Sequence, residues 1–132
     1  MVDREERLTA ALLDRPKLVG ARRLVLAVLN SWKGLRGAFK AEAAFRQEVA
    51  LAIVLVPLGF WLGSTPVEKV LLVCSVMFVL IVELLNTAVE TAIDRIGLER
   101  HALSGLAKDV GSAAVLLSFV VLLIVWGLIL FG

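Results

Sequence analysis

The sequence predicts an all-α integral membrane protein in which one interfacial amphipathic helix precedes three transmembrane helices. The first observation is compositional: 60% of the 132 residues are apolar and 20% are charged, against about half and a quarter in soluble domains. The second is size, because a soluble chain this short leaves a large fraction of its area in water and could not bury so much apolar surface. The third is a basic N-terminal region followed by three long apolar runs.

The N-terminal region divides into two parts. Residues 1–18 show no strong pattern, and we expect them to form a mobile extension of a membrane domain that covers residues 19–132. From about residue 19 to residue 40, apolar residues alternate with arginine and lysine around Trp32. This composition is typical of a helix that lies in the membrane interface. The alternative is a soluble surface helix.

The apolar runs predict membrane spans at about 43–63, 67–96 and 107–131. The stretch from Val49 to Val67 contains nineteen uncharged residues, close to the ~20 that cross a hydrocarbon core of about 30 Å. Residues 63–66 (GSTP) mark a turn, and Gly97 is the expected end of the second helix. Residues 98–108 form a polar connection to the third span.

The charges predict an orientation rather than a nucleic-acid partner. A formal net charge of +2 is too small to indicate nucleic-acid binding. Four basic residues near the span ends lie in the N-terminal region or in the 95–108 connection: Arg46, Arg95, Arg100 and Lys108. Because positive charge favours the cytoplasmic side, we expect a bacterial inner-membrane protein with a cytoplasmic N-terminus.

A stripe of polar residues lies within the second predicted span. Ionisable groups in a span are costly, so Glu83, Glu90 and Asp94 are the first candidates for function. At about 100° per residue, these three acids and Asn86 share one helix face. Such a stripe needs a metal ion, a proton relay or basic partners. The alternative is a polar seam that fixes helix packing, in which Asn86 bonds to a neighbouring helix instead of holding a carboxylate.

Helix rise separates the acids by depth. Seven residues rise about 10.5 Å, too far for Glu83 and Glu90 to hold the same ion closely. Glu42 opens the first span from the same side, so it can meet Glu90 near the cytoplasmic interface. Two carboxylates within reach of water suit a Mg²⁺ ion that also binds substrate phosphates. Glu83, which lies deeper, could act as a base.

Basic and histidine side chains offer weaker signals. Lys108, next to the amides that open the third helix, suits a phosphate, although a lysine that snorkels to the interface is the alternative. His101 is the single histidine, and an isolated loop histidine is more often solvated than a ligand. The sequence contains no G-x-x-x-x-G-K-[ST] loop and no H-R-D or D-F-G motif, so an ATP site here would be unconventional.

A resemblance to the small integral-membrane diacylglycerol kinases of bacteria rests on three segments: SWKGLRGAFKAEAAFRQE (31–48), VELLNTAVETAIDRIG (82–97) and HALSGLAKDVGSAAVL (101–116). The likeness runs from about Arg22 to the C-terminus. It implies a homotrimeric bundle whose active sites form between subunits near the cytoplasmic face. It further implies that MgATP phosphorylates diacylglycerol to phosphatidic acid.

The same resemblance implies roles for single residues. Glu83 matches the family's proton acceptor, and Glu42 and Glu90 match its metal-binding glutamates. Contacts to ATP are implied for Arg23, Asn30, Glu42, Glu90, Glu99, Arg100, His101, Lys108 and Asp109. Substrate-binding or supporting roles are implied for Trp32, Ala44, Arg46, Glu48, Asn86, Asp94 and Ser112. Asn30 and Arg100 depart from the family pattern, which has aromatic residues at these positions.

Three other functions compete with this interpretation. An undecaprenol kinase shares the architecture and the carboxylates, although the EAAFRQE and GSAA segments favour diacylglycerol. A small proton-coupled membrane transporter also uses an embedded glutamate, but it normally has four spans. A structural subunit would tolerate Glu83→Gln. A phosphorylation assay that compares the two lipids distinguishes the two kinases, and activity on neither lipid would favour the transporter.

Overall fold

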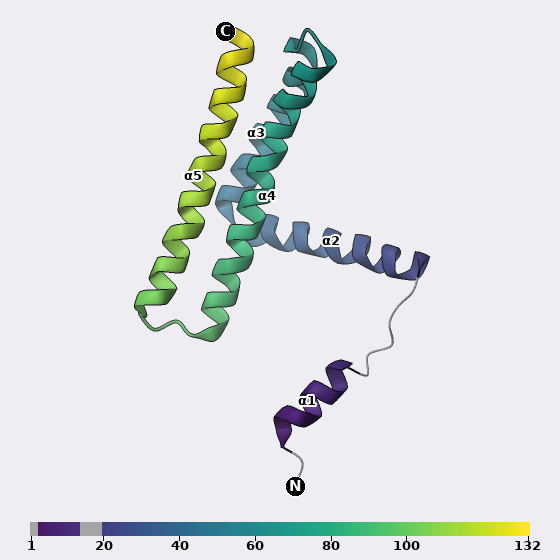
Figure 1. Cartoon of the computed structure of the whole chain (residues 1–132), viewed down its shortest axis with the longest axis vertical. Coiled ribbons are helices and arrows are strands. Elements are labelled where there is room, and N and C mark those ends of the chain that lie inside the picture. The colour runs from purple at the N-terminus through teal and green to yellow at the C-terminus, as the bar shows by residue number, and fades with distance from the viewer. Residues whose placement is uncertain (1–2, 14–19) are drawn as a thin grey trace. The chain divides into compact units, whose positions relative to one another are not determined.

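The structure, a computed structural model, describes residues 3–13 and 20–132. Its five elements are all α-helices, and the described residues form no strand, as the predicted fold class requires. The chain divides into two units, Met1–Gly34 and Leu35–Gly132. Figure 1 labels the helices along the chain.

The first unit contains helix α1 (Arg4–Leu13) and most of helix α2 (Ala21–Ala41). The prediction for residues 1–18 did not include α1. The first turn of this helix carries Glu5 and Glu6, and acidic side chains at this position stabilise a helix through its dipole. Residues 1–2 and 14–18 of that predicted extension lie outside the described residues. Helix α2 matches the helix predicted at about 19–40, and its placement at the membrane interface stays a prediction.

Helix α2 begins at a glycine with an unusual backbone conformation. Gly20 has a φ of +74°, in the left-handed region that glycine adopts without the steric cost of a Cβ atom. Its carbonyl oxygen accepts hydrogen bonds from the backbone N–H groups of Arg23 and Leu24, at 3.1 and 3.3 Å. Gly20 therefore turns the chain into the first turn of α2.

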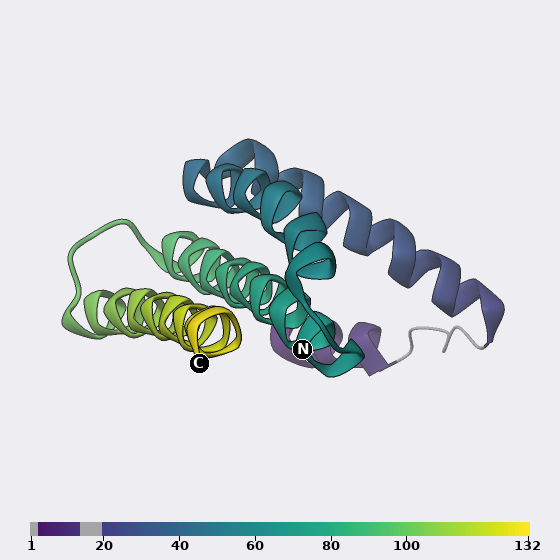
Figure 2. The ribbon, with the colours of Figure 1, turned by 90° about the horizontal axis from the view of Figure 1, so that it is seen from above.

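The second unit consists mainly of three long helices: α3 (Ala43–Leu62), α4 (Pro66–Ile96) and α5 (Ala102–Phe131). Helix α4 packs against both α3 and α5, and Figure 2 shows it between them. At 1.5 Å per residue, α3 is about 30 Å long, whereas α4 and α5 are each about 45 Å long. Helices α4 and α5 are therefore longer than the hydrocarbon core of about 30 Å, which α3 is just long enough to cross.

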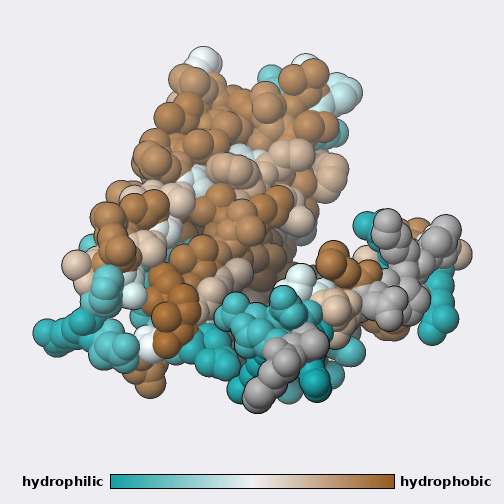
Figure 3. All heavy atoms as spheres, turned by 60° about the horizontal axis from the view of Figure 1, so that its bottom comes forward, coloured by the Kyte–Doolittle hydropathy of each residue, from teal (hydrophilic) through white to brown (hydrophobic). Residues whose placement is uncertain are grey.

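All three helices are long and apolar enough to cross a membrane. In their most apolar windows only 17%, 28% and 11% of the residues of α3, α4 and α5 are buried within the chain. Figure 3 shows hydrophobic residues over most of the visible surface of these helices. Surface of this kind must face lipid or another protein copy, since in water it would be strongly unfavourable.

The buried apolar core lies where α4 contacts its two neighbours, and it consists of Ala52, Leu72, Val76, Val79, Leu122 and Trp126. One polar connection crosses it. The indole Nε1 of Trp126 on α5 donates to the carbonyl oxygen of Leu72 and to Oγ of Ser75, both on α4 and both at 3.2 Å. These hydrogen bonds satisfy the buried indole N–H within an otherwise apolar contact.

Side-chain caps define the helix ends. Thr65 and Glu68 form a capping box at the start of α4, where Pro66 occupies the first turn. The third long helix begins five residues before the predicted start of the third span at about residue 107. Helix α5 begins at Ala102 because His101 caps it: its Nδ1 accepts from the backbone N–H of Leu103 at 3.2 Å. The polar residues that suggested a loop thus form the first turn and a half of the helix.

Candidate active site

Acidic side chains from α3 and α4 meet in one small cavity of about 280 Å³. We call it the carboxylate cavity, and it is lined by Glu42, Ala44, Glu48, Glu83, Asn86, Glu90, Ser112 and Val115. Seven of these eight residues were predicted as site residues from the sequence. The structure therefore brings together side chains that lie up to 70 positions apart in the chain (from Glu42 to Ser112).

Helix α4 supplies the polar stripe of this cavity, in the register that the sequence predicted. Glu83 is 5% exposed, whereas Asn86 and Glu90 are half-buried. The amide Nδ2 of Asn86 donates to Oε1 of Glu90 at 3.3 Å. Glu83 and Glu90 are two helical turns apart, or about 10.5 Å along the axis. The cavity thus has a buried acid at one level and a more accessible acid at another.

Helix α3 supplies Glu42 and Glu48 from its first turns. Glu42 is the N-cap residue, with an extended backbone (φ −112°, ψ 115°) that separates α2 from α3. Its side chain makes no capping hydrogen bond, so its carboxylate remains available to the cavity. Oε2 of Glu48 is buried and has no hydrogen-bond partner among the described residues. A buried oxygen without a partner is costly, and its position indicates a place where a substrate group or water is needed.

Arg46, for which the sequence predicted a substrate-binding or supporting role, contacts the end of α2. Its Nη1 donates to the carbonyl oxygens of Phe39 and Lys40, at 2.8 and 3.0 Å, and it does not line the carboxylate cavity. These carbonyls belong to the last turn of α2, which has no intrahelical partners for them. Arg46 therefore fixes the corner from which Glu42 projects.

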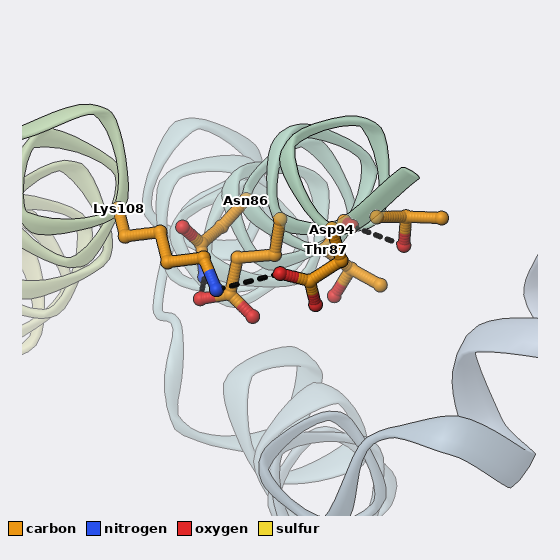
Figure 4. Close-up of polar contacts among 6 residues, drawn as sticks. Asn86, Thr87, Asp94 and Lys108 are labelled. Carbon is orange, nitrogen blue, oxygen red and sulfur yellow. Dashed lines mark hydrogen bonds and ion pairs between the residues drawn. The ribbon is translucent and has the colours of Figure 1, made fainter. Parts of the chain in front are cut away.

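A second and larger cavity of about 640 Å³ lies around the connection between α4 and α5. Five of its lining residues were predicted as site residues: Asp94, Glu99, Arg100, His101 and Lys108. We call it the connection cavity. Nζ of Lys108 lies 2.7 Å from Oδ1 of Asp94, and Figure 4 shows this pair joining α5 to α4.

Besides Arg46, four predicted site residues line neither cavity. Asp109 is exposed on α5. Arg23, Asn30 and Trp32 lie on α2 within the first unit, so a contact between them and ATP or lipid stays a prediction.

The donor set suits a magnesium ion bound together with a nucleotide. No group of three or more histidine, cysteine or acidic side chains that could hold a metal occurs in the part of the chain that the structure describes. Mg²⁺ does not need such a cage, because it usually takes one or two carboxylates and completes its shell with phosphate oxygens and water. Glu42 and Glu90 line the same cavity and would supply oxygen ligands of this kind.

Two residues at the cavity were not predicted. Val115 lines it, three positions after Ser112. The i, i+3 spacing puts both on one face of α5, and this signal could have identified Val115. Gly111 faces Asn86 so closely that a Cβ atom would overlap the amide oxygen. Nothing in the sequence specifies which α5 residue meets Asn86.

Comparisons with known proteins show to which family the chain is similar. The sequence profile of the family described as prokaryotic diacylglycerol kinase matches residues 29–130. A diacylglycerol kinase of Haemophilus influenzae is 52% identical over 115 residues, which are 87% of this chain and 98% of that protein. A diacylglycerol kinase of Escherichia coli is 50% identical over 113 residues, 86% of this chain and 93% of that protein. One of Pseudomonas aeruginosa is 45% identical over 113 residues, 86% of this chain and 92% of that protein.

Proposed function

The chain belongs to the prokaryotic diacylglycerol kinase family, and we propose that it transfers the γ-phosphoryl group of ATP to the free hydroxyl of diacylglycerol. The observation that carries this proposal is the carboxylate cavity, in which Glu42, Glu83 and Glu90 meet near one end of the membrane-crossing helices. The lipid hydroxyl stays at the headgroup boundary and ATP arrives from water. A reaction between them belongs at this level.

Glu83 is the proposed general base. It is the most buried of the four cavity glutamates, at 5% exposed, and it lines the carboxylate cavity, where the proposed lipid hydroxyl would lie. In the proposed step its carboxylate accepts the hydroxyl proton while the hydroxyl oxygen bonds to the γ-phosphorus and the bond to ADP breaks. Proton transfer of this kind contributes about 10²–10⁴-fold to a rate.

Glu42 and Glu90 are the proposed ligands of Mg²⁺, together with oxygens of the ATP phosphates. When bound, the ion neutralises charge on the phosphates, which is the main requirement of phosphoryl transfer. Glu42 comes from the start of α3 and Glu90 from α4. Their common cavity therefore links the geometry of the metal site to the packing of these two helices.

Lys108 and the connection cavity are proposed to bind the nucleotide. The Lys108 ammonium is held near Asp94 by a 2.7 Å ion pair, and Glu99, Arg100 and His101 line the same space. A cavity of about 640 Å³ is within the usual range for small-molecule sites, roughly 300–1,000 Å³. Arg23, Asn30 and Asp109 are further proposed ATP contacts, and Trp32, Ala44, Arg46, Glu48, Asn86, Asp94 and Ser112 are proposed supports for substrate binding.

We further propose that the protein works as a homotrimer in the bacterial inner membrane with its N-terminus in the cytoplasm. The large unburied apolar surface of α3, α4 and α5 supports contacts with lipid and with other copies. The basic residues near Glu42 and in the 95–108 connection support a cytoplasmic site, where ATP is available.

The direct test supplies the purified protein in lipid with MgATP and either diacylglycerol or undecaprenol, and follows ADP release and the phosphorylated lipid. Formation of phosphatidic acid with little polyprenyl phosphate is the expected result. The reverse preference would support the same active site and mechanism but would identify the substrate as the polyprenol. Phosphorylation of neither lipid by a folded sample would contradict the proposal and favour a transporter.

A further inference from the structure

One residue before Ser112, which lines the carboxylate cavity, helix α5 contacts the Asn86 side chain of α4 at Gly111. A Cβ atom at this position would overlap Oδ1 of Asn86 and lie 3.3 Å from its Cγ. Gly127, on the same helix, has no atom within 4 Å of the corresponding position. The absence of a side chain at residue 111 therefore leaves a specific space, and the Asn86 amide oxygen fills it.

The Asn86 side chain is held from both sides. Its Nδ2 donates to Oε1 of Glu90 at 3.3 Å. Its Oδ1 is buried and accepts no hydrogen bond from any described residue, but it lies against the Gly111 backbone, where a weak Cα–H···O contact is the available interaction. The amide has one favourable orientation here, because exchanging its two ends would place an acceptor against the Glu90 carboxylate.

We infer that Gly111 is a positioning residue: the space it leaves holds the Asn86 amide in the orientation that donates to Glu90. Gly111 touches no reacting group itself and acts on Glu90 only through Asn86. The consequence for catalysis rests on the proposed function, in which Glu90 binds Mg²⁺.

Of the two groups in contact, the Asn86 side chain is the one that can move. A methyl group at residue 111 is attached to the α5 backbone, which packs along α4, so the flexible Asn86 side chain has to rotate away. Rotation breaks the hydrogen bond to Glu90 and releases that carboxylate from its orientation. Loss of a group that orients a metal ligand typically weakens metal affinity about 10–100-fold.

The first test observes the side-chain amide of Asn86 by NMR, in the absence of metal and substrate. The chain contains two asparagines, Asn30 and Asn86, so selective ¹⁵N-asparagine labelling gives two side-chain NH₂ signals, and Asn86→Ala assigns them. Gly111→Ala should shift the Asn86 signal and leave the Asn30 signal in place. Gly127→Ala is the matched control and should shift neither. An unmoved Asn86 signal in Gly111→Ala would overturn the inference, whether or not the protein is a kinase.

The second test is a double-mutant cycle on the Mg²⁺ dependence of phosphoryl transfer. Gly111→Ala and Asn86→Ala should each raise the Mg²⁺ concentration for half-maximal activity by about tenfold. Adding Gly111→Ala to Asn86→Ala should have no further effect, because the overlapping atom is gone. Equal losses in both backgrounds would show that Gly111 acts through some other contact.

Folding of the variants also distinguishes an effect through Asn86 from an effect on other packing at residue 111. If Gly111→Ala alone fails to fold but the Gly111→Ala, Asn86→Ala double variant folds, the contact with Asn86 is the cause and the inference stands. If the double variant fails as well, residue 111 is required for other packing and the inference is wrong.

Discussion

The Lys108 ammonium on α5 donates a 2.7 Å hydrogen bond to the Asp94 carboxylate on α4. The two side chains are 42% and 49% exposed, so solvent screens the pair and it adds little to stability. Its effect is on position: it keeps a positive charge at the wall of the connection cavity, next to the carboxylates of α4.

Replacing this lysine separates a binding role from a structural one. Lys108→Gln should leave the melting temperature nearly unchanged and raise the KM for MgATP by about tenfold or more, the loss expected when the charged partner of a phosphate is removed. Lys69→Gln is the control, because Lys69 lies in the first helical turn of α4, at the opposite end of that helix from Asp94. It should change neither the melting temperature nor the KM for MgATP. A lower melting temperature with an unchanged KM would mean that Lys108 serves only to join the helices.

Removing either proposed metal ligand should change the metal requirement first. Glu42→Gln and Glu90→Gln keep the side-chain shape but lose the negative charge that binds Mg²⁺. We expect each to raise the Mg²⁺ concentration for half-maximal activity by at least about tenfold. Titration of activity with Mg²⁺ at saturating ATP measures this. Glu68→Gln is the control: it can still complete the capping box of α4, and its Mg²⁺ dependence should equal that of the unmodified protein. An equally unchanged Mg²⁺ dependence in Glu42→Gln would refute the assignment of Glu42 as a metal ligand.

The buried indole of Trp126 should contribute to stability through its hydrogen bonds to Leu72 and Ser75. Trp126→Phe removes the donor and leaves two buried acceptors less well satisfied. Hydrogen bonds between membrane helices average about 0.6 kcal/mol and reach about 1.7 kcal/mol, so we expect a loss in that range plus the cost of the smaller ring. Unfolding in detergent measures it. Trp61→Phe, at a side chain that is 80% exposed, should cost less, and equal losses would show that the indole bonds do not matter.

The sequence predicted the helices well because their signals are local. The long apolar runs give α3, α4 and α5, and the spacing of Glu83, Asn86 and Glu90 gives a polar face on α4. The start of α5 was missed because one side chain, His101, caps a segment whose composition is typical of a loop. A cap of this kind depends on the orientation of a single ring and leaves no periodic signal.

The residues that meet this polar face were harder to predict. Ser112 was expected from the family resemblance, whereas Val115 and Gly111 were not. Which residue of α5 lies opposite Asn86 depends on the register and crossing of two helices, and these follow from packing along their whole length. Arg46 shows the same limitation, because its role depends on where the carbonyl oxygens at the end of α2 lie.

The most direct test of the account is the turnover of Glu83→Gln, measured as phosphatidic acid formed from diacylglycerol and MgATP by protein whose melting temperature and oligomeric state match the unmodified chain. Glutamine keeps the shape of the side chain but cannot accept the hydroxyl proton. We predict a rate at least about 10²-fold lower, with MgATP binding retained. Full activity in this variant would show that Glu83 is not the base and that its burial serves packing alone.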